Sequence, residues 1–164
     1  MAKNLLSSVE VFADLDGSEI EIMEKSAQEM VFPADSVIFK QGEQGDKMYL
    51  IVYGIVEIWK SEGQEIKGSR LARLKQGEIF GEMALFDKEP RSASAVTSLT
   101  KEAKMLVWDD KDLQKLIQAQ PVFGTKILNN FLKSPLLELY LLFGAMSIIV
   151  HSDLSFDPSI VAYS

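Results

Sequence analysis

The sequence predicts a mostly β domain with flanking helices, and three observations support this fold class. Its 164 residues are 47% hydrophobic and 25% charged, which suits one globular domain with a core, alone or with an appendage. Short runs rich in β-branched and aromatic residues recur between turn residues from position 30 to about position 108, as in a sandwich or barrel. Apolar residues at helical spacing lie before and after this stretch.

Residues 4–29 are predicted to be helical. Asp16 precedes Glu19 by three positions, the spacing of a capping box, in which each side chain hydrogen-bonds the backbone amide of the other residue. Three apolar residues then follow at helical spacing: Ile20, Met23 and Ala27.

The middle of the chain predicts about eight short strands. Gly54 lies between two of the clearest runs and predicts a hairpin corner, because glycine adopts a positive φ without steric cost. Six runs are the strongest strand candidates: residues 36–39, 49–53, 55–59, 70–74, 93–97 and 105–108.

Two helices are predicted after the strands. The pair Asp109–Asp110 offers an N-cap and places acid at the positive end of a helix over residues 111–120. Pro121 suits the first position of a second helix, which continues over residues 122–133. Ser134–Pro135 then interrupts the helical pattern.

Composition changes after Lys133. All 17 Lys and Arg lie at or before it, whereas residues 134–164 carry only acidic charges. We therefore expect a domain over residues 1–134 and an apolar tail over residues 135–164, without a helix-turn-helix domain. Four readings of the tail stay open: a helix packed on the domain, a homodimer contact, a partial membrane span and a non-native end. Its apolar stretch, 136–150, is short for a span, which needs roughly 20 residues.

Composition also narrows the function classes. A net charge of −7 disfavours direct nucleic-acid binding, where phosphate neutralisation supplies much of the affinity. The chain has no Cys and one His, His151, which leaves little material for a metal site, a thiol nucleophile or imidazole chemistry. No apolar segment follows the N-terminus as in a signal peptide, and we expect a cytoplasmic location.

Residues 80–93 combine the features of an anion site. Gly81 lets backbone approach a ligand closely, and the helical turn expected after it has free amides that point one way. Arg91 adds a planar, permanently charged group. Glu82 would repel phosphate, so it would face a sugar hydroxyl, and a nucleotide with a free ribose hydroxyl satisfies both residues. A surface hairpin in which a nearby acid pairs with Arg91 is the alternative.

This segment resembles a known family motif. Gly81-Glu-Met-Ala-Leu85, four further residues and Pro90-Arg-Ser-Ala93 resemble the phosphate-binding cassette of the cyclic nucleotide-binding domain family, which includes catabolite activator proteins and regulatory subunits of cyclic-AMP-dependent protein kinase. The resemblance extends from about residue 4 to residue 133. It implies an eight-stranded β-roll, a jelly-roll-like double-stranded β-helix, with an N-terminal helix and two C-terminal helices.

The resemblance also implies a role for each cassette residue. Glu82 would accept hydrogen bonds from the ribose 2′-hydroxyl, and Arg91 would pair with the exocyclic phosphate oxygens. Ser92 favours cyclic AMP as the ligand, because Thr at this position goes with cyclic GMP in the family. The ligand-binding set comprises Gly81, Glu82, Met83, Ala84, Arg91, Ser92 and Ala93, with Ile58, Leu71 and Leu74 forming an apolar wall beside the base.

We therefore predict a cyclic-nucleotide sensor that binds its ligand without hydrolysing it and relays binding by moving the C-terminal helices. The residues that would cover the base fall near Glu138, beyond the break at Ser134–Pro135. A ligand-independent interaction domain, or a regulatory fragment of a transcription factor, channel or kinase, is the alternative. A cupin-like enzyme or a phosphodiesterase would need metal ligands or a nucleophile. The protein effector is left open.

Overall fold

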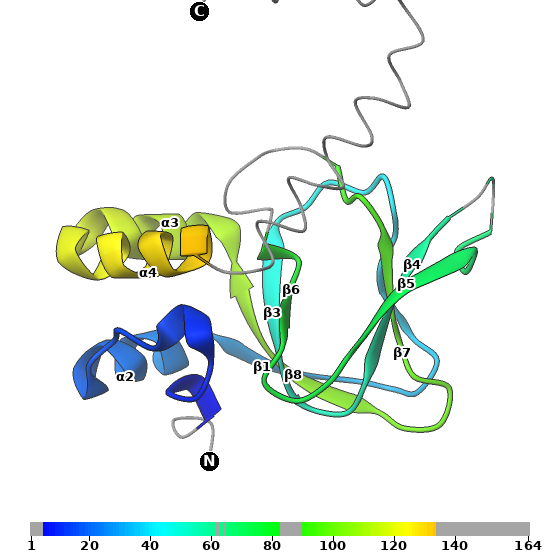
Figure 1. The fold of residues 1–164 in the computed structure, drawn as a ribbon, viewed down its shortest axis with the longest axis horizontal. Helices are drawn as coiled ribbons and strands as arrows, with labels where there is room; N and C mark the ends of the chain where they lie inside the picture. Colours follow the sequence, from blue (N-terminus) through cyan, green and yellow to red (C-terminus); the bar gives the residue numbers. More distant parts are fainter. Residues whose placement is uncertain (1–4, 62, 64, 83–89, 134–164) are drawn as a thin grey trace, which may run out of the picture.

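The computed structural model describes residues 5–61, 63, 65–82 and 90–133, and within these it has the predicted fold (Figure 1). A short 3-10 helix, η1 (Glu10–Phe12), and helix α2 (Gly17–Ser26) precede the strands, and α3 (Asp110–Ala119) and α4 (Pro121–Lys133) follow them. The strands are β1 (Gln28–Phe32), β2 (Val37–Phe39), β3 (Lys47–Tyr53), β4 (Val56–Lys60), β5 (Ser69–Leu74), β6 (Ile79–Phe80), β7 (Ser94–Thr97) and β8 (Ala103–Asp109).

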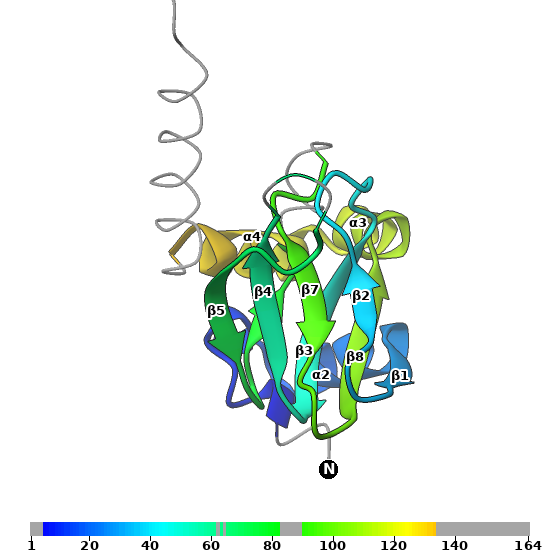
Figure 2. The ribbon, with the colours of Figure 1, turned by 90° about the vertical axis from the view of Figure 1, so that its right-hand side faces the viewer.

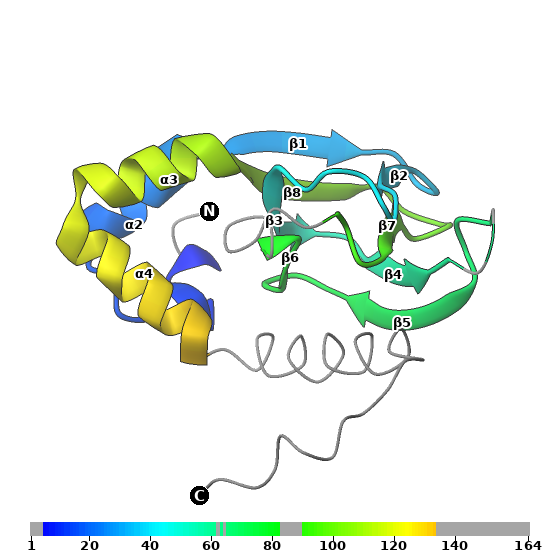
Figure 3. The ribbon, with the colours of Figure 1, turned by 90° about the horizontal axis from the view of Figure 1, so that it is seen from above.

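The strands form two four-stranded antiparallel sheets. One sheet has the order β1-β8-β3-β6 and the other the order β2-β7-β4-β5, which faces the viewer in Figure 2. Helices α2, α3 and α4 gather on the side of the first sheet, away from the second (Figures 1 and 3). The first sheet therefore lies between the helices and the second sheet.

Strand alternation divides the apolar residues between two cores. Successive side chains of a strand point to opposite faces. Strand β3 accordingly sends Met48 and Leu50 to the core beneath the helices, and Tyr49 and Ile51 to the core between the sheets. Because both faces of β3 are buried, its sequence is a continuous apolar run.

The local signals at the N-terminal ends of the helices are confirmed. The Asp16 carboxylate accepts hydrogen bonds from the Ser18 and Glu19 amides, and the Glu19 carboxylate accepts one from the Asp16 amide, as the capping box predicts. Asp109 caps α3, and Pro121 is the first residue of α4. Gly54, at the predicted hairpin corner, has a φ of 97°.

The predicted helix over residues 4–29 is wrong at its C-terminal end. Gln28 and Glu29 belong to β1, which pairs with β8 from Gln28 to Phe32. Four of the five β1 residues are exposed, so the strand lacks apolar alternation and depends on backbone pairing with β8. The two-residue strand β6 was also missed. The predictions for residues 83–89 and for the tail lie outside the described residues.

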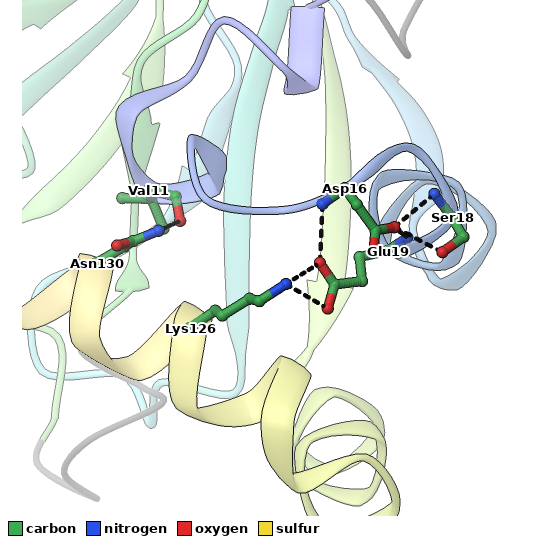
Figure 4. A network of polar contacts seen from close by, with 6 residues as sticks. All are labelled: Val11, Asp16, Ser18, Glu19, Lys126 and Asn130. Carbon is green, nitrogen blue, oxygen red and sulfur yellow. Dashed lines mark hydrogen bonds and ion pairs between the residues drawn. The ribbon is translucent and has the colours of Figure 1, made fainter.

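A polar network joins α4 to the N-terminal elements (Figure 4). The buried Asn130 side chain donates to the Val11 carbonyl at 3.1 Å. Lys126 Nζ lies 2.9 and 2.7 Å from the two carboxylate oxygens of Glu19, and one of these oxygens also accepts the Asp16 amide at 2.8 Å. One carboxylate thus completes the cap of α2 and binds α4.

None of the helices within the described part of the chain combines the length and apolar character needed to cross a membrane.

Candidate functional site

The backbone of Arg91 is held in a defined place before β7. Its amide donates to the Glu43 carbonyl at 2.8 Å, and its carbonyl accepts the Gly42 amide at 2.8 Å. An isolated β-bridge pairs Gln44, which follows Glu43, with Pro90, which precedes Arg91. The loop after β2 therefore positions the end of the predicted cassette.

The Arg91 guanidinium points inward, and the residue is only 8% exposed. Its Nη1 donates to the Gly81 carbonyl at 2.9 Å, and its Nη2 donates to the Lys47 carbonyl at 2.7 Å. Burial lowers the Arg91 pKa, and this effect is opposed by Tyr49, Asp46 and other nearby acids. A guanidinium has five N–H donors, so these two hydrogen bonds leave capacity for an anionic ligand.

Aromatic rings support the guanidinium from one side. Arg91 Cζ lies 4.2 Å from the centroid of the Phe39 ring, well within the range of a cation–π contact. The Phe39 ring packs against Tyr49 and Phe80, with centroids 5.8 and 6.0 Å away, and Tyr49 stacks on Phe80 at 4.9 Å. This packing fixes the orientation of the Phe39 ring, whose face contacts the Arg91 guanidinium.

Gly81 is required where it meets Arg91. Its φ is +73°, a conformation that L side chains rarely adopt. A Cβ there would lie 2.9 Å from Arg91 Nη1 and 3.0 Å from the Lys47 carbonyl oxygen. Glycine therefore permits both the turn after β6 and the close approach of the guanidinium.

Glu82 is half-buried beside this pair. Burial raises the pKa of its carboxyl, while its own backbone amide and the charge of Arg91 act in the opposite direction. A carboxylate that has lost part of its hydration is stabilised by any hydrogen-bond donor that a ligand brings to it. Gly81, Glu82 and Arg91 are thus brought together by the fold.

The other predicted residues are distributed around this group. Ile58 and Leu74 pack against the core between the sheets, and Ala93 is buried. Leu71 is 50% exposed on β5, beside a register shift in the β4–β5 pairing. Ser92 is exposed. Met83 and Ala84 lie outside the described residues.

Arg91 also borders a cavity of about 260 Å³, whose lining includes Phe39 and Tyr49. Among the predicted site residues that the structure describes, Arg91 alone lines it, and its lining includes the acidic residues Glu43 and Asp46. Two carboxylates disfavour a phosphate, and the volume is below the roughly 300–1,000 Å³ of common ligand pockets. This cavity is therefore a poor site for an anionic ligand.

Sequence reasoning missed the residues that hold Arg91 from distant segments. Phe39 and the Lys47 carbonyl contact the guanidinium, yet no local motif links them to it. Lys60 was missed as well, although strand alternation places it on the same face of β4 as Ile58. Its Nζ donates to the Ser92 carbonyl at 2.9 Å.

Comparison with known proteins identifies the family. The family model described as the cyclic nucleotide-binding domain matches residues 29–120, more than half of the chain. The chain belongs to this family. The predicted resemblance is therefore confirmed, and the matched region contains both ends of the cassette and all eight strands except the first residue of β1.

Relatives with curated names include regulators and kinases. The CRP-like cAMP-activated global transcriptional regulator of Mycobacterium tuberculosis is 30% identical over 126 residues, which cover 76% of this chain and 54% of the regulator. A cGMP-dependent protein kinase of Caenorhabditis briggsae is 32% identical over 118 residues, which cover 70% of this chain and 15% of the kinase. The chain thus spans about half the length of the first relatives that it matches.

Solved structures share the fold. A cyclic nucleotide-binding domain from Methylobacillus flagellatus has a TM-score of 0.69 and 27% identity, and the match covers 93% of this chain and 83% of that one. The predicted β-roll with its N-terminal and C-terminal helices is confirmed.

Proposed function

We propose that this chain is a regulatory module that binds cyclic AMP at the segment between Gly81 and Ala93 and does not convert it chemically. The observation that carries the proposal is the buried Arg91, which is anchored by two carbonyls and one aromatic ring beside Gly81 and Glu82. The guanidinium would bind the cyclic phosphate, and Glu82 would accept the ribose hydroxyl. Family membership supports a cyclic nucleotide as the ligand.

The choice of cyclic AMP over cyclic GMP rests on Ser92. The M. tuberculosis regulator is named as cAMP-activated, and the C. briggsae kinase as cGMP-dependent, so the family accommodates both ligands. Ser92 carries the cyclic AMP preference that the resemblance implies. Competition between the two nucleotides, measured by calorimetry with purified protein, tests this choice, and tighter binding of cyclic GMP would overturn it.

Binding without hydrolysis is supported by the residue types available. No group of three or more metal-binding side chains occurs within the described ranges, and the sequence supplies one His and no Cys. Phosphodiester hydrolysis needs a metal-bound water or an activated nucleophile. Cyclic AMP incubated with the protein should be recovered unchanged by chromatography. Formation of AMP would show that the module is an enzyme.

Calorimetric titration with cyclic AMP tests the site directly. Arg91→Ala should weaken binding at least tenfold, because a charged hydrogen-bond donor to the phosphate is lost. Arg73→Ala is the matched control, because Arg73 is exposed on β5 and lies 4.0 Å from Glu57. The absence of heat and of a thermal shift at millimolar cyclic AMP would overturn the proposal.

The proposed relay runs from the cassette to α3 and α4. The Asp110 amide at the start of α3 donates to the Asp46 carbonyl at 2.8 Å, next to Lys47, whose carbonyl binds Arg91. Trp108, in the strand before α3, packs against Phe12 at 6.0 Å and reports on the helices. In a Trp59→Phe background, cyclic AMP should change Trp108 fluorescence. An unchanged spectrum at saturating ligand would refute helix movement.

The homodimer contact through the C-terminal helix and tail stays a prediction. It is supported by Val122 and Leu128 of α4, which are 73% and 37% exposed. Light scattering of the full chain tests it, and a monomer mass across the micromolar range would contradict it.

A further inference from the structure

Lys60 reaches the cassette from the neighbouring strand. Strands β4 and β7 pair with Ile58 opposite Ala95 and Trp59 opposite Ser94, which places Lys60 just beyond the last pair. Lys60 and Ile58 share one face of β4, because alternate residues of a strand point to the same side. This is the face toward the space between the sheets, since Ile58 packs against the core there. Lys60 Nζ lies 2.9 Å from the Ser92 carbonyl oxygen.

The charge of Lys60 is available to a ligand. Glu57 lies on the opposite face of β4, where it pairs with Arg70 at 3.0 Å and Arg73 at 4.0 Å. The contact that Lys60 makes among the described residues is with a neutral carbonyl, and its side chain is exposed. An ammonium has three donors and a flexible stem, so Lys60 can bind an anion beside Ser92 without leaving the strand.

We propose that Lys60 is a further ligand-binding residue, a second cation that acts with Arg91 on the cyclic phosphate. The inference rests on the proposed function, because it assigns a partner to the same bound nucleotide. Arg91 and Ser92 are adjacent in sequence, so the contact to Ser92 brings the Lys60 ammonium next to the residue pair that would hold the phosphate. Lys60 would approach from the end of β4, and Arg91 from the segment that precedes β7.

The two cations differ in what holds them. Arg91 is buried and fixed by carbonyls and an aromatic ring, whereas Lys60 is exposed and held by one neutral contact. A solvated charge contributes less to affinity than a buried one and is screened more by salt. Lys60 should therefore add moderate affinity and a salt dependence, and Arg91 should supply most of the recognition.

Calorimetry with cyclic AMP at low and high salt tests the proposal on the full chain. Lys60→Met should weaken binding about three- to fivefold at low salt, the upper range for one solvated charge pair, and should reduce the salt dependence. Lys60→Arg should stay within about twofold of wild type, because it keeps the charge. Lys101→Met is the control, since Lys101 is exposed in the loop at the other end of β7 and should leave binding unchanged.

Three results would overturn the inference, and they separate it from the proposed function. If wild type binds cyclic AMP and Lys60→Met binds it equally well with the same salt dependence, Lys60 does not contact the phosphate. If Lys60→Arg binds as weakly as Lys60→Met, the side chain supports the cassette backbone and its charge is not used. If wild type itself does not bind, the proposed function fails and the role of Lys60 fails with it.

Discussion

Replacement of Gly81 by alanine should lower both the stability of the fold and its affinity for the ligand. The same replacement at a second glycine, Gly77, separates the cost of the backbone conformation from the cost of the contact with Arg91. Gly81 and Gly77 have similar backbone conformations, with φ values of +73° and +85°. An added Cβ at Gly77 would meet only the Leu5 side chain, at 3.9 Å, whereas one at Gly81 would meet Arg91 Nη1 at 2.9 Å and the Lys47 carbonyl oxygen at 3.0 Å. The first substitution isolates the cost of the backbone conformation.

The magnitudes follow from these contacts. A non-glycine residue at positive φ costs about 1–2 kcal/mol, and this is the whole expected effect of Gly77→Ala. Gly81→Ala adds the displacement of a buried guanidinium from two carbonyls, and each hydrogen bond to a charged group contributes about 1.5–3 kcal/mol. With partial relaxation of the Arg91 side chain, we expect a total loss of about 3 kcal/mol. Cyclic AMP affinity should fall at least tenfold, because Arg91 no longer lies where the phosphate would bind.

Urea unfolding followed by tryptophan fluorescence measures the stability of both variants, and calorimetric titration measures their affinity for cyclic AMP. Gly77→Ala should bind within about threefold of wild type, since its free-energy cost falls on folding alone. Equal stability losses and equal affinities for the two variants would refute the argument that Gly81 exists to admit Arg91.

Three other perturbations have defined outcomes. Asn130→Ala should lower the free energy of unfolding in urea by about 1–2 kcal/mol, because it leaves the Val11 carbonyl without its donor. Replacement of the exposed neighbour, Asn129→Ala, should change it by no more than about 0.5 kcal/mol, and similar losses for the two variants would argue against the α4 network. Trp108→Phe should lower the free energy of unfolding by about 2–4 kcal/mol, because it removes buried volume and the indole hydrogen bond to the Met23 carbonyl at 3.0 Å. A loss below about 1 kcal/mol in urea unfolding would contradict the place of Trp108 in the core. Burial raises the pKa of Glu82 in the folded state, so the stability of wild type relative to Glu82→Gln should fall as pH rises through that raised pKa. Urea unfolding of both proteins from about pH 4 to about pH 7 measures this difference in stability, and an increase in the difference with pH would refute the argument.

Much of the architecture can be predicted from short segments of the sequence. The capping box at Asp16 and Glu19, the N-cap at Asp109 and the first-turn Pro121 depend on contacts within a few residues, and each was predictable. The strand β1 was not, because its exposed residues carry no apolar pattern and its pairing partner, β8, lies far along the chain. Backbone pairing of this kind leaves little trace in composition.

The candidate site likewise has a part that the sequence predicts and a part that only the tertiary structure shows. The spacing of Gly81, Glu82 and Arg91 predicted a group that the fold does bring together, since these residues belong to one local cassette. The sequence by itself also determined the family and the ligand class that we propose. Which groups hold Arg91 in place was decided only by tertiary structure, because the Phe39 ring and the Lys47 carbonyl come from strands distant in sequence. The same holds for Lys60, whose approach to Ser92 depends on the register between β4 and β7, a long-range pairing that no local pattern encodes.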